Sequence, residues 1–157
     1  MLPSLMAVLM AVAVLCCGIF AGAAIYVNLV EHPARMEGGT ANALIEWAPS
    51  YRRATLMQAP LAIVGGLSAI GAELAGADRA WLVGGLLLLS VVPFTLLVIM
   101  PTNRALSAPE AAQDLSRTAA LLTRWNRLHA VRTVLSTLAF LLFIWVLVGH
   151  VPPAGAP

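Results

Sequence analysis

The sequence predicts an all-α integral membrane protein, an antiparallel bundle of four helices that cross the bilayer. Four apolar stretches lead to this prediction: residues 4–30, 55–75, 80–101 and 121–148. Each is long enough to span a hydrocarbon layer about 30 Å thick. Hydrophobic residues make up 61% of the chain and charged residues 10%, compared with about 45–50% and about 25% in soluble domains. The composition therefore excludes an ordinary soluble fold.

The first span is expected to end at Pro33, because proline lacks a backbone N–H and pushes the preceding residue out of the helical conformation. Residues 33–53 then form a long polar connection. Within it, residues 40–47 can form a short amphipathic helix at the membrane interface, with Trp47 as an aromatic anchor.

The second and third spans are joined by a tight link through Gly76 and Asp78. Pro93 is expected to kink the third span, which ends before Pro101. A second polar connection, residues 102–120, leads into the fourth span. These elements predict one membrane domain at residues 1–150. The Pro- and Gly-rich tail at residues 151–157 is expected to be disordered.

The distribution of arginines predicts the topology. Seven flank the spans on the side of the two long connections: Arg35, Arg52, Arg53, Arg104, Arg117, Arg124 and Arg127. The other side carries Arg79 alone. By the positive-inside rule, both termini lie outside the cytoplasm, and the expected location is a bacterial inner membrane. The chain has no contiguous basic stripe, so nucleic acid is not an expected partner, whereas the lipid bilayer is.

Polar side chains gather at the predicted cytoplasmic end of all four spans, where burial in the membrane marks a candidate site. They are Asn28, Glu31 and His32 on the first span, Gln58 on the second, Asn103 after the third, and Trp125, Asn126, His129 and Arg132 on the fourth. Asn126, His129 and Thr133 share one helix face. His129 lies about 12 Å inside its span, too deep for an imidazole to reach water. It therefore needs a partner within the protein.

Several roles remain open for these residues. His129, Asn103 and Gln58 can serve as structural hydrogen bonds between helices, and Glu31 can form an ion pair with Arg132 or Arg35. Two histidines and a carboxylate suit iron or zinc, so Glu31, His32 and His129 form a candidate metal site. No closely spaced histidine motif supports that site.

The chain resembles the anthrone-oxygenase-like family of small four-helix membrane proteins. The resemblance covers almost the whole chain and is most specific in two segments, Pro101-Thr102-Asn103 and the run Arg124 to Arg132 with Trp125, Asn126 and His129. It implies a cofactor-independent monooxygenase that oxidises polyketide anthrones to anthraquinones. The catalytic candidates are then Asn103, Asn126, His129 and Arg132, with Trp125, Asn28, Gln58 and Trp47 as substrate-binding candidates.

The chemistry fits these side chains. A neutral His129 can remove a proton from the acidic anthrone methylene, while Arg132 or Asn126 stabilises the enolate oxygen. A flat, hydrophobic substrate would enter from the bilayer. Two alternatives stay open: a non-catalytic accessory or lipid-binding module, and a metal- or haem-binding redox protein that uses His32 and His129. The sequence leaves a homo-oligomer open as well.

Overall fold

The computed structural model describes residues 4–149, which form helices and the turns between them. In chain order the elements are α1 (Leu5–Tyr26), the π-helical turn η1 (Val27–Glu31), α2 (His32–Glu37), α3 (Thr40–Leu74), α4 (Ala80–Phe94), the π-helical turn η2 (Thr95–Ile99), α5 (Met100–Ser107), the 3-10 helix η3 (Pro109–Ala112) and α6 (Leu115–Gly149). The tail predicted at residues 151–157 lies outside the described residues.

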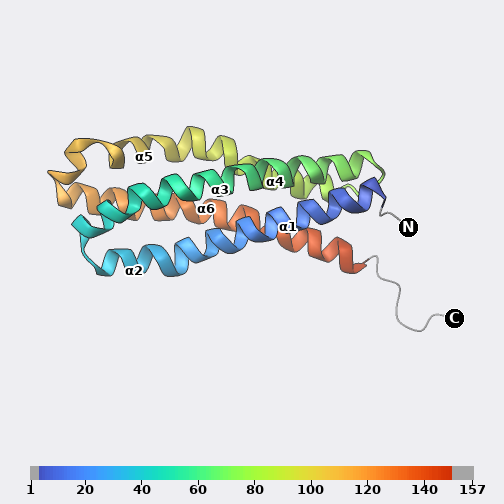
Figure 1. Cartoon of the computed structure of the whole chain (residues 1–157), viewed down its shortest axis with the longest axis horizontal. Helices are drawn as coiled ribbons and strands as arrows, with labels where there is room; N and C mark the ends of the chain where they lie inside the picture. The colour runs from blue at the N-terminus through green and yellow to red at the C-terminus, as the bar shows by residue number, and fades with distance from the viewer. Residues whose placement is uncertain (1–3, 150–157) are drawn as a thin grey trace.

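These elements join into four continuous rods, each long and apolar enough to cross a membrane, which suggests an integral membrane protein. The rods are Leu5–Glu37, Thr40–Leu74, Ala80–Ser107 and Leu115–Gly149. The predicted all-α, four-span fold is therefore confirmed. The rods run antiparallel, and α1 begins at the end of the bundle where α6 finishes (Figure 1).

Helix α1 packs against α3 and α6, and α4 packs against the same two helices, so the rods form a closed ring. The second half of the first rod therefore lies beside the first half of α6. Both lie toward the end of the bundle that carries the α2–α3 turn and η3 (Figure 1). We call this the connection end of the bundle; the polar candidates of the sequence lie toward it.

The prediction that the first span ends at Pro33 is wrong. The helix continues through Pro33 to Glu37, because Pro33 occupies the first turn of α2, where its missing N–H costs nothing. The chain then reverses at Gly39, whose φ of 86° favours glycine. Residues 40–47 are consequently the first turns of α3 and not a separate interfacial helix.

The third rod is built in the same way around Pro101. Pro101 occupies the first turn of α5, which follows η2 and continues to Ser107. The second connection is therefore shorter than predicted and contains η3. Helix α6 begins at Leu115, and the Asp114 carboxylate caps it by accepting the Arg117 backbone N–H at 2.9 Å.

The π-helical turn η1 adds one residue to a turn of the first rod and thereby changes its buried face. On α1, Phe20 and Ala24 are buried, and the same spacing continued would bury Glu31. After η1, His32 and Arg35 are buried instead, whereas Glu31 is partly exposed. The turn thus places the His32 imidazole inside the bundle in place of the Glu31 carboxylate.

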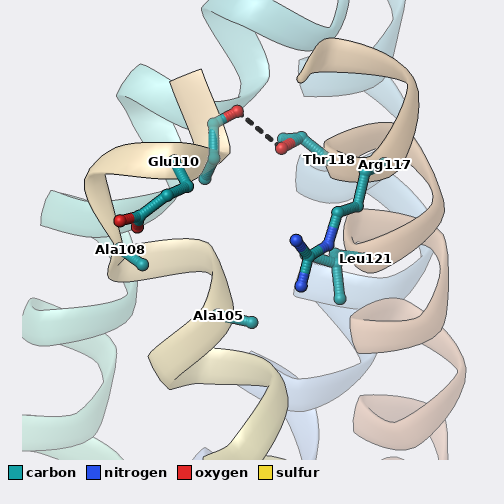
Figure 2. A pocket seen from close by; sticks show the side chains of 7 residues that line it. Ala105, Ala108, Glu110, Arg117, Thr118 and Leu121 are labelled. Carbon is teal, nitrogen blue, oxygen red and sulfur yellow. Dashed lines mark hydrogen bonds between the residues drawn. The ribbon is translucent and has the colours of Figure 1, made fainter. Parts of the chain in front are cut away.

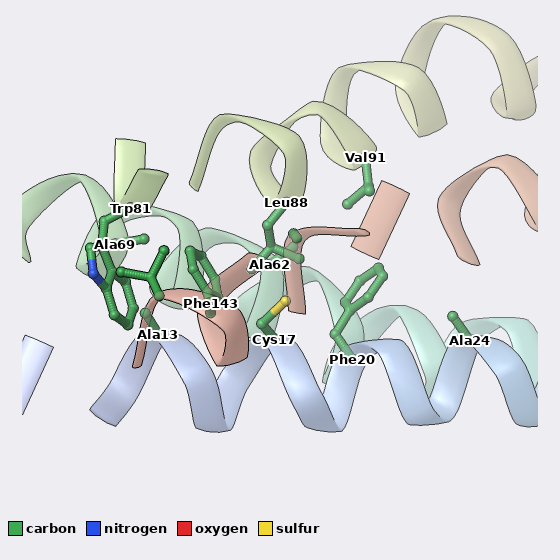
Figure 3. Packing of buried hydrophobic residues seen from close by; sticks show 12 residues of the cluster. Ala13, Cys17, Phe20, Ala24, Ala62, Ala69, Trp81, Leu88, Val91 and Phe143 are labelled. Atoms are coloured by element: carbon green, nitrogen blue, oxygen red, sulfur yellow. The ribbon is translucent and has the colours of Figure 1, made fainter. Parts of the chain in front are cut away.

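The core between the termini and the middle of the bundle is apolar and tightly packed (Figure 3). Trp81 stacks on Phe143 with ring centroids 4.9 Å apart. A Cβ atom added at Gly84 would lie 2.3 Å from the Phe143 ring, so α4 and α6 approach closely because this residue has no side chain. The polar residues lie beyond this core, toward the connection end.

Candidate active site

Asn28 holds His129 in one orientation. The Asn28 Nδ2 donates to the Asn126 backbone carbonyl at 3.0 Å and to Asn126 Oδ1 at 2.7 Å. A carbonyl only accepts, so the Asn28 amide orientation is fixed with Oδ1 toward His129, whose Nδ1 lies 3.0 Å away. Nδ1 must therefore carry the proton in the neutral imidazole, which leaves Nε2 as the basic nitrogen.

Thr133 completes this network between η1 and α6. Its hydroxyl lies within hydrogen-bond distance of Asn28 Oδ1 and, at 3.2 Å, of the Ala24 carbonyl. The sequence placed Asn126, His129 and Thr133 on one face of the fourth span, and the structure shows all three in contact with η1 or α1. The amide of Asn28, which the sequence predicted to bind substrate, thus forms its hydrogen bonds with other residues of the protein.

Arg132 lies one helical turn further along α6. Its guanidinium donates to Gln58 Oε1 at 2.7 Å and lies over the Phe20 ring, with the guanidinium carbon 5.4 Å from the ring centroid. Residues 4–149 place no carboxylate within ion-pair distance of Arg132. A guanidinium without a counter-charge is unusual inside a bundle, which makes Arg132 a candidate site residue.

Two adjacent cavities share a wall made of Tyr51, Thr55, Gln58 and Arg132. One, of about 100 Å³, is mainly apolar and is lined by residues of α1, α3, α4, η2, α5 and α6; we call it the apolar cavity. Leu96 lines it and is 57% exposed, so this cavity reaches the outer surface of the bundle. The other, of about 20 Å³, we call the small cavity.

The small cavity lies beside His129. His129 and Trp125 line it from α6, Ser50 lines it from α3, and Arg35 lines it from α2. Arg132 thus faces both cavities, whereas His129 faces the small one. The His129 imidazole and the Arg132 guanidinium therefore both line the small cavity, and Arg132 also lines the adjoining apolar cavity.

An aromatic group packs around His129. The Trp125 ring lies 5.0 Å from the His129 ring and 5.5 Å from the His32 ring, measured between centroids. Trp47 packs edge-on against Trp125 at 6.1 Å and stacks on Tyr51 at 5.1 Å. Trp47 is fully buried and lines neither cavity. Trp125 therefore packs against both imidazoles.

The predicted metal site is not assembled. The described residues contain no group of three or more His, Cys, Asp or Glu side chains that could hold a metal ion. Glu31 instead pairs with Arg35 and accepts from the Ser50 hydroxyl, while Trp125 contacts both His32 and His129. Of the two ion pairs that the sequence allowed for Glu31, the structure shows the one with Arg35.

Asn103 lies apart from the two cavities. It is 2% exposed, and its amide has no hydrogen-bond partner within the described part of the chain. It lies on α5 between Ile99 and Leu106, which belong to the same buried cluster as Trp47 and Trp125. The catalytic role that the resemblance implied for Asn103 stays a prediction.

Comparison with known proteins decides the family. A family model described as anthrone oxygenase matches residues 47–142. The chain is 32% identical over 124 residues to anthrone oxygenase dmxR16 of a Cryptosporiopsis species, a match that covers 74% of this chain and 72% of the relative. The chain belongs to the anthrone oxygenase family. This confirms the resemblance seen in the sequence.

A second member of the anthrone oxygenase family, tpcL of Aspergillus fumigatus, is 42% identical over 62 residues, which is 38% of each chain. No solved structure matches this chain. Both relatives are fungal, so they give no support to the predicted bacterial membrane. The family match contains Gln58, His129 and Arg132, whereas Asn28 and Arg35 precede it.

Sequence reasoning did not assign four polar residues that line the small cavity to the site: Arg35, Ser50, Tyr51 and Thr55. Arg35 was predicted as a flanking charge and as a possible ion-pair partner of Glu31, and the three others fall in or beside a segment predicted to be a loop. Their signal was the spacing of Tyr51, Thr55 and Gln58, which places them on one face of a helix. Because residues 33–53 were predicted to be a loop, this helical spacing was not recognised.

A further cavity of about 190 Å³ lies at the connection end, between α5, η3 and α6 (Figure 2). The Thr118 hydroxyl donates to the Ala111 carbonyl at 2.6 Å and closes one side of it. Glu110 and Arg117 lie on opposite sides. None of the predicted site residues lines this cavity.

Proposed function

We propose that this protein is a membrane-embedded oxygenase that acts on a hydrophobic aromatic polyketide of the anthrone class. The observation that carries the proposal is the junction at Arg132, where an apolar cavity meets a small cavity lined by His129. The printed names of both relatives describe anthrone oxygenases and support the substrate class.

The substrate enters from the bilayer into the apolar cavity. Leu96 of η2 and Thr55 of α3 line this cavity, and both are exposed on the outside of the bundle. Its volume of about 100 Å³ is below the roughly 300 Å³ of an ordinary small-molecule site. A tricyclic substrate therefore requires α3 and the α4–η2 segment to move apart. The movement occurs at the π-helical turn η2, because such turns depart from regular helical bonding.

His129 acts as the general base. Asn28 holds the Nδ1–H, so Nε2 accepts a proton from the substrate methylene that is flanked by aryl rings. The negative charge that develops on the substrate oxygen is stabilised by Arg132, which the Gln58 hydrogen bond and the Phe20 ring hold in place. Loss of the proton yields an electron-rich carbanion.

Dioxygen then completes the reaction. The carbanion transfers one electron to O2, and the resulting substrate radical and superoxide combine to form a C–O bond. The peroxide is protonated; loss of the remaining C–H proton with cleavage of the O–O bond leaves a carbonyl and water. One CH2 group and one O2 become one C=O and one H2O, so the reaction needs no external reductant.

Oxygen uptake by protein in lipid nanodiscs tests the proposal. The rate is measured with a panel of anthrones and corrected for their spontaneous oxidation. His129→Ala is expected to lower kcat at least about 100-fold, whereas Arg127→Ala, on the exposed face of the same helix, is expected to have no effect. Circular dichroism and thermal unfolding verify that both variants fold.

Two results would contradict the proposal. Unchanged turnover in a folded His129→Ala protein would remove the proposed base. No uptake above the spontaneous rate by the folded parent, across the panel, would favour the accessory or lipid-binding alternative.

A further inference from the structure

The small cavity contains hydrogen-bond donors without acceptors. Four residues that line it each have a buried N–H with no partner among residues 4–149: Arg35 at Nε, Gln58 at Nε2, Trp125 at Nε1 and Arg132 at Nε. Arg35 is 6% exposed and Gln58 is 2% exposed. Glu46 lies 3.9 Å from Arg35 Nε, beyond hydrogen-bond distance. Buried donors are normally satisfied, so this cavity is built for an acceptor.

The charges at the cavity do not balance. Glu31 neutralises Arg35, and the Glu46 side chain is 65% exposed. Arg132 has only the neutral Gln58 and the Phe20 ring in the described structure. One guanidinium therefore stays without a counter-charge inside the bundle, where unpaired charge is unfavourable. A bound anion would remove that penalty.

The size of the cavity limits its ligand. About 20 Å³ is enough for one water-sized molecule and excludes a ring of the substrate. We propose that the small cavity binds dioxygen and stabilises the superoxide formed from it. The assignment rests on the proposed function, because that reaction supplies the electron.

The arrangement suits the electron transfer. When the substrate carbanion gives one electron to O2, a neutral diatomic becomes an anion, and only the anion gains from the donors of Arg35, Gln58 and Arg132. The cavity therefore stabilises the product of the step more than its reactant, which favours the transfer. Arg132 faces both cavities, so the superoxide forms beside the substrate with which it must combine.

The dependence of the rate on oxygen tests the site. Arg35 lines the small cavity and not the apolar one. Arg35→Gln should therefore lower kcat/KM for O2 about tenfold or more, the factor expected for a lost charge-assisted hydrogen bond, and leave the KM for the anthrone within about twofold. Arg35→Lys, which keeps the charge, should show a smaller loss. Arg117→Gln makes the same charge change on an exposed side chain and should show none.

Removing the counter-charge should act in the opposite direction. Glu31→Gln frees Arg35 from its carboxylate, so it should keep or raise kcat/KM for O2 although it lowers the thermal stability. Equal kcat/KM for O2 in the parent and a folded Arg35→Gln protein would overturn the assignment. An equal rise in the KM for the anthrone would also overturn it, because Arg35 would then act on the substrate.

A binding measurement separates this site from the oxygenase activity. Chloride replaces gluconate at constant ionic strength while thermal unfolding is followed in nanodiscs. The parent should be stabilised by chloride, Glu31→Gln more so, and Arg35→Gln less. This pattern of chloride stabilisation would show an anion site whether or not the protein oxidises an anthrone. If no anthrone were oxidised, superoxide would have no source, and the dioxygen assignment would be overturned although the anion site remained. No chloride effect in the parent would mean that the cavity holds water only, which also overturns it.

Discussion

Replacing Asn28 should separate the orientation of the base from its presence. Asn28→Ala removes the acceptor of His129 Nδ1 and the donor to Asn126, and it also removes a contact of Thr133. Two to three buried polar groups lose a partner, at about 0.6–2 kcal/mol each between membrane helices. We therefore expect a loss of about 2–4 kcal/mol in the free energy of unfolding.

Catalysis should fall by more than stability alone explains. Without Asn28 Oδ1, the proton of the His129 ring can sit on either nitrogen and the ring can turn, so kcat should drop about 10- to 100-fold. Asn28→Asp keeps an acceptor for Nδ1 and loses only the donor to Asn126. It should retain clearly more activity than Asn28→Ala.

The assay is oxygen uptake at saturating anthrone, with thermal unfolding measured on the same nanodisc preparations. Ser90→Ala is the matched control, because the Ser90 hydroxyl bonds only to Leu87 of its own helix among the residues described. If Asn28→Ala keeps the parent kcat, or if the Ala and Asp variants lose the same amount, Asn28 does not act through the tautomer of His129.

Two more predictions test the topology and the packing. A reporter that is active only in the cytoplasm, fused to the C-terminus and expressed in bacteria, should stay silent because seven arginines flank the opposite side; a signal would invert the topology. Gly84→Ala should lower the free energy of unfolding by about 1–3 kcal/mol, since its Cβ would overlap Phe143. Gly22→Ala, which meets no atom within 4 Å, should leave thermal unfolding unchanged, and equal effects would refute this account.

The four long helices could be predicted from the sequence, because an apolar stretch that crosses the bilayer must be helical and must have a minimum length set by the bilayer thickness. The sequence was also sufficient for the main pairing at the site. In an antiparallel bundle the end of the first rod and the start of the last can meet, and Asn28 does bond to His129 and Asn126. What the pattern could not supply was the order of helices around the ring, which depends on side-chain packing between rods.

The prolines misled the prediction for a physical reason. Proline predicts a helix end when the residues before it keep regular α-helical bonding. At Pro33 a π-helical turn precedes the proline, and the His32 N–H bonds to the Val27 carbonyl five residues back. The rod therefore continues, and Arg35 stays inside the bundle. A sequence read by hydropathy alone assigns that arginine to the membrane surface.

A π-helical turn also precedes the proline of the third rod, but there the buried face does not change. Ile99, at the end of η2, is 1% exposed and lies three regular helical turns after the buried Leu88. Asn103 lies on the same face as the buried Gly85, five regular turns earlier, whereas η1 changes the face of the first rod and brings His32 inward. A regular α-helix would have kept the same buried face along the first rod, with Glu31 inward. The π-helical turn η1 instead brings His32 inward, so that the apolar core of the first rod gives way to a polar interior toward the connection end without ending the helix.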